Sequence, residues 1–446
     1  MKANETNLNR FLAQNDTQFV IPVYQRNYDW AITHCKQLID DILLVGCDNK
    51  ISSHFIGSIV FIHDDIYSSS GIRELTIIDG QQRVTTVTLI YIVLLKIAMR
   101  NENKQLVSRI NETFLINKFA ESEKLKLRPT ENNDKALKFL LNVHDESQTF
   151  SEYSRLIENF DYLTTRINEH NIEIIQKGLD KLMFVEISLE RDKDDPQRIF
   201  ESLNSTGLDL SQADLIRNYI LMGLKHQHQV KIYENYWQSI ERLCTVKETN
   251  ENRVSDFIRD FLTIENRDIP NKSKVYQEFK SKYKFGNDLE LLEKILTKIR
   301  KYANYYHRLI NPADEQDIDI KRQIEFINKL EINVSYPFIL EVFNDFENKV
   351  INKDTFIQVL ELIQSFVWRR FVVGLPTNAL NKIFMRLYED VDNSDYIVSI
   401  QKSLVKKKST QRFPKNSEII EILKEKDFYG IQSRNRMYLL ERLENF

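Results

Sequence analysis

Three short segments of the chain combine residue types that can bind or act on a ligand. The first (IPVYQRNYDW, residues 21–30) places Tyr24 next to Gln25 and Arg26, with two further aromatic residues behind them. Aromatic rings stack on flat bases, and Gln and Arg side chains hydrogen-bond to polar groups on base edges. The same pattern is typical of an N-terminal arm whose aromatic side chains anchor it in a core. The sequence alone leaves both interpretations open.

The second segment (IIDGQQR, residues 77–83) stands where a strand is expected to pass into a helix. Gly80 allows a sharp backbone turn, and the free N–H groups and positive dipole end of the helix favour an anion such as phosphate. Arg83 can bind phosphate oxygens, Asp79 can hold Mg²⁺ or a ribose hydroxyl, and Thr85 and Thr86 add hydroxyl groups near the helix start. A strand, an Asp-Gly turn and a helix also form a plain structural junction, so this alternative stays open. The chain has no GxxxxGK[ST] pattern, which argues against a P-loop enzyme.

The third segment (RIFESLNSTG, residues 198–207) ends in a run of small polar residues. Asn204, Ser205 and Thr206 are expected at a helix C-terminus, where such side chains often satisfy the last carbonyl groups. They can equally close over a ligand.

The elements that must position these segments can be read from hydrophobic patterning. Residues 54–63, 74–79 and 182–190 are β-branched or alternating and predict strands. The most apolar stretch, residues 84–99, predicts a helix buried on nearly all sides; it contains polar residues and is shorter than the ~20 residues of a bilayer span.

The pattern becomes helical from about residue 195. Asp195 and Pro196 predict a helix start, and Gly207 its end. Residues 210–214 resemble a capping box that opens a helix through about residue 224. Further helices are expected at 354–371 and after Thr377. The fold class expected from this order is α+β, with a small mixed sheet and helices first and a largely α-helical region after it.

Length and composition limit the fold classes and the kinds of site that the chain can form. The chain has 446 residues, enough for about three domains of ~150 residues. It has only 10 Gly and 8 Pro, about a third of their usual combined share of roughly 12%, which disfavours turn-dense sandwiches and barrels. Three widely spaced cysteines exclude a disulfide framework or a Cys-based zinc site. The N-terminus has no apolar signal core, so a cytoplasmic location is expected.

Nucleic-acid binding would have to come from local patches, because the formal net charge is only -3. Two segments are locally basic, residues 402–415 and residues 272–284, the second with interleaved aromatic residues. Each can contact phosphates or form an ordinary solvated surface. We expect DNA contacts from the first of them, at Lys406, Lys407, Lys408 and Arg412.

Taken together, the motifs resemble a known family. Four segments of this chain are IPVYQRNYDW, HFIGSIV, IIDGQQRVTTVTL and RIFESLNSTGLDLSQADLIRNYIL. Their order and spacing resemble those in the N-terminal domain of GmrSD-type modification-dependent restriction enzymes, a group that includes the SspE-like phosphorothioate-sensing proteins. The resemblance runs from about Phe19 to Leu221. Later pieces, Arg369-Arg370 with Gly374, PTNALNKIF and RMYLLERLE, resemble the helical region of the same proteins.

The resemblance implies a core similar to ParB and sulfiredoxin in which the DGQQR segment binds and hydrolyses a nucleoside triphosphate, GTP or ATP, with Mg²⁺. A sulfiredoxin-like thiol-repair activity is disfavoured, because residues 80–83 contain no cysteine. The catalytic residues expected on this basis are Asp79, which is also the metal ligand, Gln82 and Arg83. The nucleotide-binding residues expected are Tyr24, Gln25, Arg26, Gly80, Gln81, Thr85, Thr86, Asn204, Ser205 and Thr206.

Members of this family usually continue into an HNH-type nuclease domain, which needs histidines for metal binding and proton transfer. The last of the eight histidines here is His307, so no HNH-like setting follows it. We therefore expect residues 1–221 to form the ParB/sulfiredoxin-like nucleotide-binding domain with a helical insertion. Residues 222–446 are expected to form an α-helical domain that precedes an absent nuclease domain.

The function expected is an NTP-hydrolysing sensor module of an anti-phage restriction system that couples nucleotide turnover to recognition of modified DNA. Its partners would be DNA and an HNH-type nuclease domain in cis or in trans, without a membrane; a homo-oligomer is compatible with this interpretation. The alternative is a non-catalytic ParB-like protein that binds DNA or regulates without hydrolysis.

Overall fold

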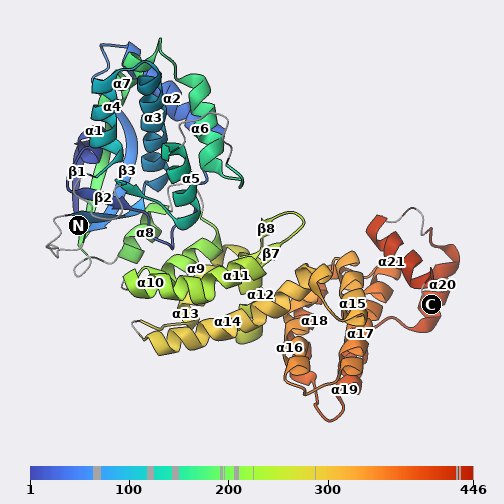
Figure 1. Cartoon of the computed structure of the whole chain (residues 1–446). Coiled ribbons are helices and arrows are strands. Elements are labelled where there is room, and N and C mark those ends of the chain that lie inside the picture. The colour runs from blue at the N-terminus through green and yellow to red at the C-terminus, as the bar shows by residue number, and fades with distance from the viewer. Residues whose placement is uncertain are drawn as a thin grey trace. The chain divides into compact units, whose positions relative to one another are not determined.

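The computed structural model describes residues 1–446 except 64–71, 118–124, 143–149, 191–193, 195, 205–209, 225, 287, 428–429, 431–432 and 445–446. The chain forms two compact units, one of residues 1–210 with 218–229 and one of residues 211–217 with 230–446 (Figure 1). The first unit is a mixed sheet with helices and the second is almost entirely helical. The α+β class expected from the sequence is confirmed.

The sheet of the first unit has six strands in the order β1-β6-β3-β4-β2-β5. β3 pairs antiparallel with β4 and parallel with β6, β2 pairs parallel with β4 and β5, and β1 pairs antiparallel with β6. The strands are β1 (Lys2–Asn7), β2 (Thr17–Val20), β3 (His54–His63), β4 (Arg73–Asp79), β5 (Leu127–Arg128) and β6 (Leu182–Glu190). The three strands predicted from the sequence are β3, β4 and β6, and all three are confirmed.

Helix α3 begins directly after β4 and lies among the other helices next to the sheet of the first unit (Figure 1). The helices of this unit are α1 (Leu8–Leu12), α2 (Ile32–Cys47), α3 (Gln81–Arg100), α4 (Lys104–Ile110), α5 (Glu131–Asn142), α6 (Arg155–Arg166), α7 (Ile172–Asp180) and α8 (Pro196–Asn204). Two further helices, α9 (Gln212–Leu221) and α10 (His226–Ile232), are each divided between the two units. A π-helical turn (Asn111–Leu115) follows α4.

The predicted buried helix is confirmed in α3, which packs against α4 and α6. Among the described residues α3 is the one helix long and apolar enough to cross a membrane by length and composition, yet 83% of its apolar window is buried inside the protein. It therefore serves as the central core helix of this unit. A helix buried on all sides must have every neighbouring surface supplied by other elements.

Lys126 is a buried cation that joins the end of α1 and the residues after it to the π-helical turn. Its ammonium group donates hydrogen bonds to the carbonyl oxygens of Leu12 (2.9 Å), Gln14 (2.9 Å) and Thr113 (2.6 Å). Burial lowers the pKa of Lys126 to about 8, and the charge of Asp16 partly opposes this shift. Since Lys126 is only 1% exposed, these carbonyl groups take the place of water as partners of the ammonium, and the ammonium in turn satisfies their need for a donor.

Helices α2 and α7 approach each other backbone to backbone at two glycines. A Cβ atom on Gly178 of α7 would lie 2.1 Å from the carbonyl oxygen of Ile42, and one on Gly46 of α2 would lie 2.1 Å from that of Ile174. Backbone atoms cannot rotate away as a side chain can, so any larger residue must separate the helices.

We expect Gly178→Ala to lower the free energy of unfolding by about 2 kcal/mol, because overpacking a close helix contact forces backbone shifts. Urea-induced unfolding followed by circular dichroism measures this change. The control is Gly223→Ala, where an added Cβ meets no atom within 4 Å. Equal unfolding midpoints for the two variants would contradict the close-contact interpretation.

The second unit is a set of packed helices with one short hairpin, β7 (Thr245–Val246) and β8 (Glu251–Asn252). A π-helical turn (Tyr233–Trp237) precedes α11. The helices that lie wholly in the second unit are α11 (Gln238–Leu243), α12 (Val254–Asn266), α13 (Val275–Lys282), α14 (Leu289–Ile310), α15 (Ile318–Lys329), α16 (Tyr336–Glu347), α17 (Lys353–Val372), α18 (Leu380–Leu387), α19 (Tyr396–Lys406), α20 (Asn416–Glu425) and α21 (Ser433–Glu444).

Helix boundaries follow the capping signals in the sequence. The predicted capping box is present at α9, where the backbone N–H of Asp214 donates to Ser211 Oγ (3.1 Å) and that of Ser211 donates to Asp214 Oδ2 (3.3 Å). The helix predicted at 354–371 is α17, and Gly374 beyond it has a φ of 74°. Gly207, the predicted end of α8, lies outside the described residues.

Candidate functional site

The turn between β4 and α3 has the geometry that the sequence predicts for the DGQQR segment. Gly80 adopts a left-handed conformation (φ 92°) as the N-cap of α3. A Cβ atom at this position would lie 2.9 Å from Ile59 Cγ1 and 3.1 Å from the carbonyl oxygen of Ser58, so only glycine fits. No side chain of the described residues caps this helix start. The first N–H groups of α3 are thus placed as in helix termini that bind anions.

Arg83 lies in the first turn of α3 against strand β3. Its Nη1 atom donates to the carbonyl oxygen of Ile56 (3.0 Å), and its Nη2 atom lies 3.5 Å from Asp79 Oδ2. A Cβ atom on Gly57 (φ 101°) would lie 2.3 Å from Arg83 Nη1, so this glycine makes room for the guanidinium. The β3–β6 pairing is interrupted by a register shift at this point.

Arg83 and Asp79 are the charged pair of this turn. Burial lowers the pKa of Arg83 while the neighbouring Asp79 carboxylate opposes the shift, and an arginine remains charged in either case. The side chains of Arg83 and Asp79 are 21% and 32% exposed, so a ligand can reach both. The structure therefore brings these two predicted catalytic residues together at the surface.

The glutamines of the turn bind the arm formed by residues 21–30. Gln82 Oε1 accepts the backbone N–H groups of Asp29 (2.9 Å) and Trp30 (3.3 Å), and Gln82 Nε2 donates to the carbonyl oxygen of Asn27 (3.3 Å). All the polar atoms of this amide are thus engaged with the arm.

A second amide pair fastens the arm nearer its start. Gln81 Nε2 donates to Gln25 Oε1 (3.2 Å), and Gln25 Nε2 donates to the carbonyl oxygen of Ile78 at the end of β4 (2.8 Å). The predicted site residues Gln25, Gln81 and Gln82 therefore lie together, each 7% exposed, and hold protein backbone and one another.

The aromatic side chains of the arm are core anchors. Tyr24 is 1% exposed and Tyr28 is 5% exposed. The Tyr28 hydroxyl lies 2.7 Å from Thr86 Oγ1 and 3.2 Å from Cys35 Sγ, and Thr86 Oγ1 donates to the carbonyl oxygen of Gln82 (2.8 Å). Since Thr86 already donates its proton, Tyr28 donates to Thr86, and the Cys35 thiol donates to Tyr28. Burial raises the pKa of Tyr28 and of Cys35.

The two threonines predicted near the ligand lie under the turn. Thr85 is 2% exposed and Thr86 is fully buried. Of the two open interpretations of the arm, the structure favours aromatic anchors in the core over stacking on a base.

Arg26 remains at the surface of the arm. Its Nη1 atom lies 4.0 Å from Asp29 Oδ2, and the other carboxylate oxygen of Asp29 lies 3.1 Å from Nε of Arg155, the first residue of α6. The sequence analysis did not identify Arg155, because nothing in the local pattern at the start of α6 distinguishes it from any exposed helix residue.

The third predicted segment is only partly described. Asn204 is the last residue of α8, a helix that packs against β4, while Ser205 and Thr206 lie outside the described residues. Their expected role near the ligand stays a prediction.

Residues 8–221 match the family model described as GmrSD restriction endonuclease, N-terminal domain. This chain carries a GmrSD N-terminal domain. The match includes the arm, the turn at Gly80 and all of α8, and it ends at the last residue of α9. No curated protein matches the chain. The family expected from the motifs is therefore confirmed for residues 8–221, which match the N-terminal domain of a family of restriction endonucleases.

The basic segment at residues 402–415 lies beyond the part that matches the GmrSD domain. Lys406 is the last residue of α19, and Lys406 and Lys408 are exposed. Cations near a helix C-terminus interact favourably with its dipole, which is a sufficient structural reason for their position. Arg412 is paired through both terminal nitrogens with Glu418 (2.7 and 3.0 Å), so it is less available to a phosphate than the three lysines.

Two buried or half-buried arginines of α17 fix the backbone of this segment. Arg370 donates to the carbonyl oxygens of Thr410 (2.7 Å) and Arg412 (3.3 Å), and Arg369 donates to Asn416 Oδ1 (2.6 Å). Lys407 and Lys408 therefore lie between the end of α19 and an anchored stretch of backbone.

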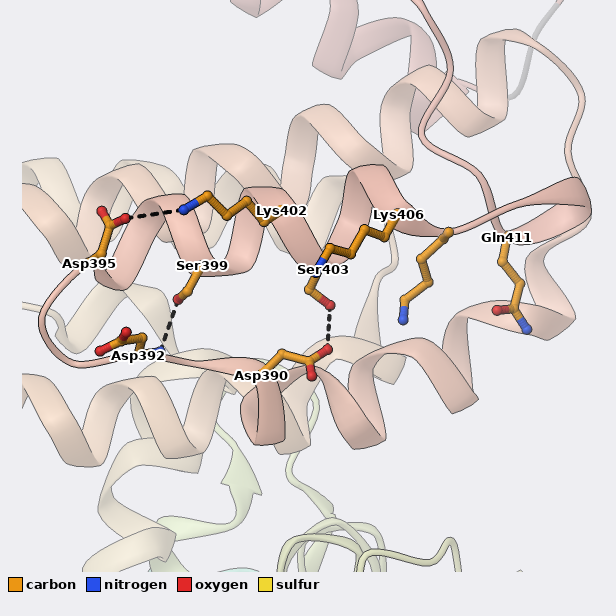
Figure 2. Close-up of a pocket in the computed structure, with 9 residues that line it drawn as sticks. Asp390, Asp392, Asp395, Ser399, Lys402, Ser403, Lys406 and Gln411 are labelled. Atoms are coloured by element: carbon orange, nitrogen blue, oxygen red, sulfur yellow. Dashed lines mark hydrogen bonds and ion pairs between the residues drawn. The ribbon is translucent and has the colours of Figure 1, made fainter.

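The lysines also line an open hollow of about 480 Å³ that contains three aspartates (Figure 2). Within it Lys402 lies 3.6 Å from Asp395, and Ser403 donates to Asp390 (2.6 Å). Negative charge in the hollow confines any phosphate contact to the Lys406–Lys408 side. In the other basic segment, Tyr276 and Phe279 are buried, so these rings are not available for base stacking.

We expect Gln82→Ala to lower the free energy of unfolding of the GmrSD domain by about 1 kcal/mol, because it leaves two partly buried donors and one partly buried acceptor of the arm without their partner. Hydrogen exchange of peptides that cover residues 27–30 should become faster. The control is Gln37→Ala, an exposed glutamine on α2. Unchanged exchange at 27–30 in the Gln82 variant would show that other contacts hold the arm.

Proposed function

We propose that the GmrSD domain of this chain binds a nucleoside triphosphate, GTP or ATP, at the Gly80 turn and hydrolyses it with Mg²⁺ as the sensor module of a modification-dependent DNA restriction system. The observation that carries the proposal is the partly exposed Arg83–Asp79 pair at a helix start without a side-chain cap. Nucleotide turnover would be coupled to cleavage by an HNH-type nuclease domain, in cis or in trans.

The residues of the turn suit the parts of a nucleotide. The N–H groups of the first turn of α3 and the Arg83 guanidinium would bind phosphate oxygens, since both are hydrogen-bond donors that favour an anion. Asp79 would hold Mg²⁺, which proteins commonly bind through one or two carboxylates together with substrate phosphates. The metal would neutralise charge on the phosphates, while Arg83 would stabilise charge that develops during transfer to water.

One observation favours the alternative of nucleotide binding without hydrolysis. A hydrolytic site needs a group that orients water, and the amides of Gln25 and Gln82 are engaged with the arm and with β4. A protein of this second kind would use the nucleotide as a regulatory ligand for DNA binding. Turnover and binding must therefore be measured separately.

Arg83→Ala should abolish hydrolysis of GTP and ATP with Mg²⁺ and weaken nucleotide binding by on the order of 10²-fold, because it removes a charged fork from the phosphates. Calorimetry measures binding and phosphate release measures turnover. The control is Arg100→Ala, an exposed arginine in the last turn of the same helix. Wild-type turnover by the Arg83 variant would show that the site is elsewhere, whereas wild-type protein that binds but never hydrolyses would support the alternative.

We also propose that Lys406, Lys407 and Lys408 contact DNA phosphates. Replacing all three by Glu should weaken binding to every DNA sequence alike and flatten the dependence of log affinity on log salt by roughly 0.9 for each phosphate that the protein no longer neutralises. Hydrolysis in the absence of DNA should not change. Affinity measured by fluorescence anisotropy at several salt concentrations gives the slope.

The matched control changes the same total charge in the other basic segment of the same unit, with the exposed residues Lys272, Lys274 and Lys284 replaced by Glu. We expect a smaller change of slope for this control. If the 406–408 variant keeps the full wild-type slope, the lysines form only a solvated surface.

A further inference from the structure

Beside the Gly80 turn, one exposed carboxylate sits between two arginines. Asp29 Oδ1 lies 3.1 Å from Arg155 Nε, and Asp29 Oδ2 lies 4.0 Å from Arg26 Nη1. The exposed fractions of the side chains are 54% for Asp29, 38% for Arg155 and 24% for Arg26. The cluster is thus open to solvent on the surface of the arm.

Contacts on both sides connect this cluster to the turn. The backbone N–H of Asp29 donates to Gln82 in the first turn of α3 (2.9 Å). On the other side, Asn159 of α6 donates to the carbonyl oxygen of Trp30 (2.6 Å), and α6 begins with Arg155. The arm is therefore held between the first turn of α3 and α6, with Arg155 of α6 against it and Arg83 of α3 on the β3 side of the turn.

The charges of this region favour an incoming anion. Arg26, Arg83 and Arg155 carry three positive charges. Among the described residues of the cluster and the turn, the negative charges paired with them are the two carboxylates of Asp29 and Asp79. An ion pair between exposed side chains contributes little, so the Asp29 carboxylate is easily displaced. Phosphate oxygens carry more charge and accept paired hydrogen bonds from a guanidinium.

We propose that the Asp29 carboxylate occupies the place of a phosphate group, and that the triphosphate of a nucleotide displaces it to bind Arg155 and Arg26. The inference rests on the proposed nucleotide site and adds Arg155 to it as a binding residue. Asp29 acts as an internal competitor that weakens binding and keeps the arginines paired when the site is empty.

Two substitutions should change affinity in opposite directions. Arg155→Ala should raise the Kd for GTP or ATP with Mg²⁺, and for inorganic triphosphate, by about tenfold, because it removes a charge-assisted hydrogen bond. Asp29→Asn should lower the same Kd values by about threefold, because the competing negative charge is removed. The arm should stay in place in Asp29→Asn, since Gln82 binds the backbone of residue 29 and not its side chain.

The controls come from a matched surface pair in the same unit. Glu74 is 53% exposed and lies 3.5 Å from Arg128. Glu74→Gln and Arg128→Ala make the same charge changes at an ion pair outside the Asp29 cluster, and they should leave Kd unchanged because the backbone contact of Arg128 with Ile21 does not involve its side chain. Arg155→Lys, which keeps the charge without the planar fork, should recover part of the affinity and so shows that the weaker binding of Arg155→Ala is not misfolding.

The outcomes separate this inference from the proposed function. Wild-type protein that binds none of the three ligands overturns both. Wild-type binding that is unaffected by Arg155→Ala overturns the inference alone. It is also overturned if Asp29→Asn weakens binding as much as Arg155→Ala does, since the pair would then only support the arm.

Discussion

The first unit depends on the burial of α3, which is buried from its first turn to Ala98. Apolar residues face outward on every side of this helix, and the sheet, α4, α6 and the arm cover them. Such burial stabilises the unit, but it also leaves the polar ends of the helix as the places where backbone groups must find partners. At the N-terminal end the chain enters from β4 through Gly80 and supplies no capping side chain, so the polar groups of this end determine what the surface there can bind.

The amides of Gln81 and Gln82 do not cap the N-terminus of α3. They bind the arm. Each contact joins a side chain in the first turn of α3 to a segment more than fifty positions away, at residues 25–30. The polar groups that remain for a ligand at the turn are charged: Asp79 and Arg83 on the β3 side, and Arg26 with Arg155 on the arm side. Two of the four residues were predicted as catalytic and a third as nucleotide-binding. Of the five residues in the DGQQR sequence, Gln81 and Gln82 therefore bind the arm, while the proposed nucleotide site uses Asp79 and Arg83 of the same motif.

Much of the first unit could be predicted because its signals are local. β3, β4, β6 and α3 have strong apolar patterns, and the left-handed conformation of Gly80 follows from the strand-to-helix junction. β1 was missed because KANETN is polar and lies at an edge of the sheet, and β2 and β5 because they are only four and two residues long. The sequence could not decide whether Tyr24 and Tyr28 face a ligand or the core, since both alternatives use the same residue types. Arg155 could not be predicted for another reason. It lies beside Asp29 because α6 packs on the arm, through a contact between Trp30 and Asn159, which are 129 positions apart in the sequence.

In the second unit, an arginine side chain binds the backbone of a distant loop, as the glutamine side chains bind the arm in the first unit. Arg370 is 2% exposed, which is unfavourable for a guanidinium unless acceptors surround it, and here the carbonyl oxygens of residues 376, 410 and 412 provide them. Burial lowers the pKa of Arg370, and the nearby positive charge of Arg412 adds to the shift. Because these acceptors are backbone groups, the arginine fixes the course of the loop without neutralising the lysines that precede it. Electrostatic binding to a polyanion gains from such an arrangement, since lysines on an anchored backbone lose less conformational freedom when they contact phosphates than lysines on a free loop.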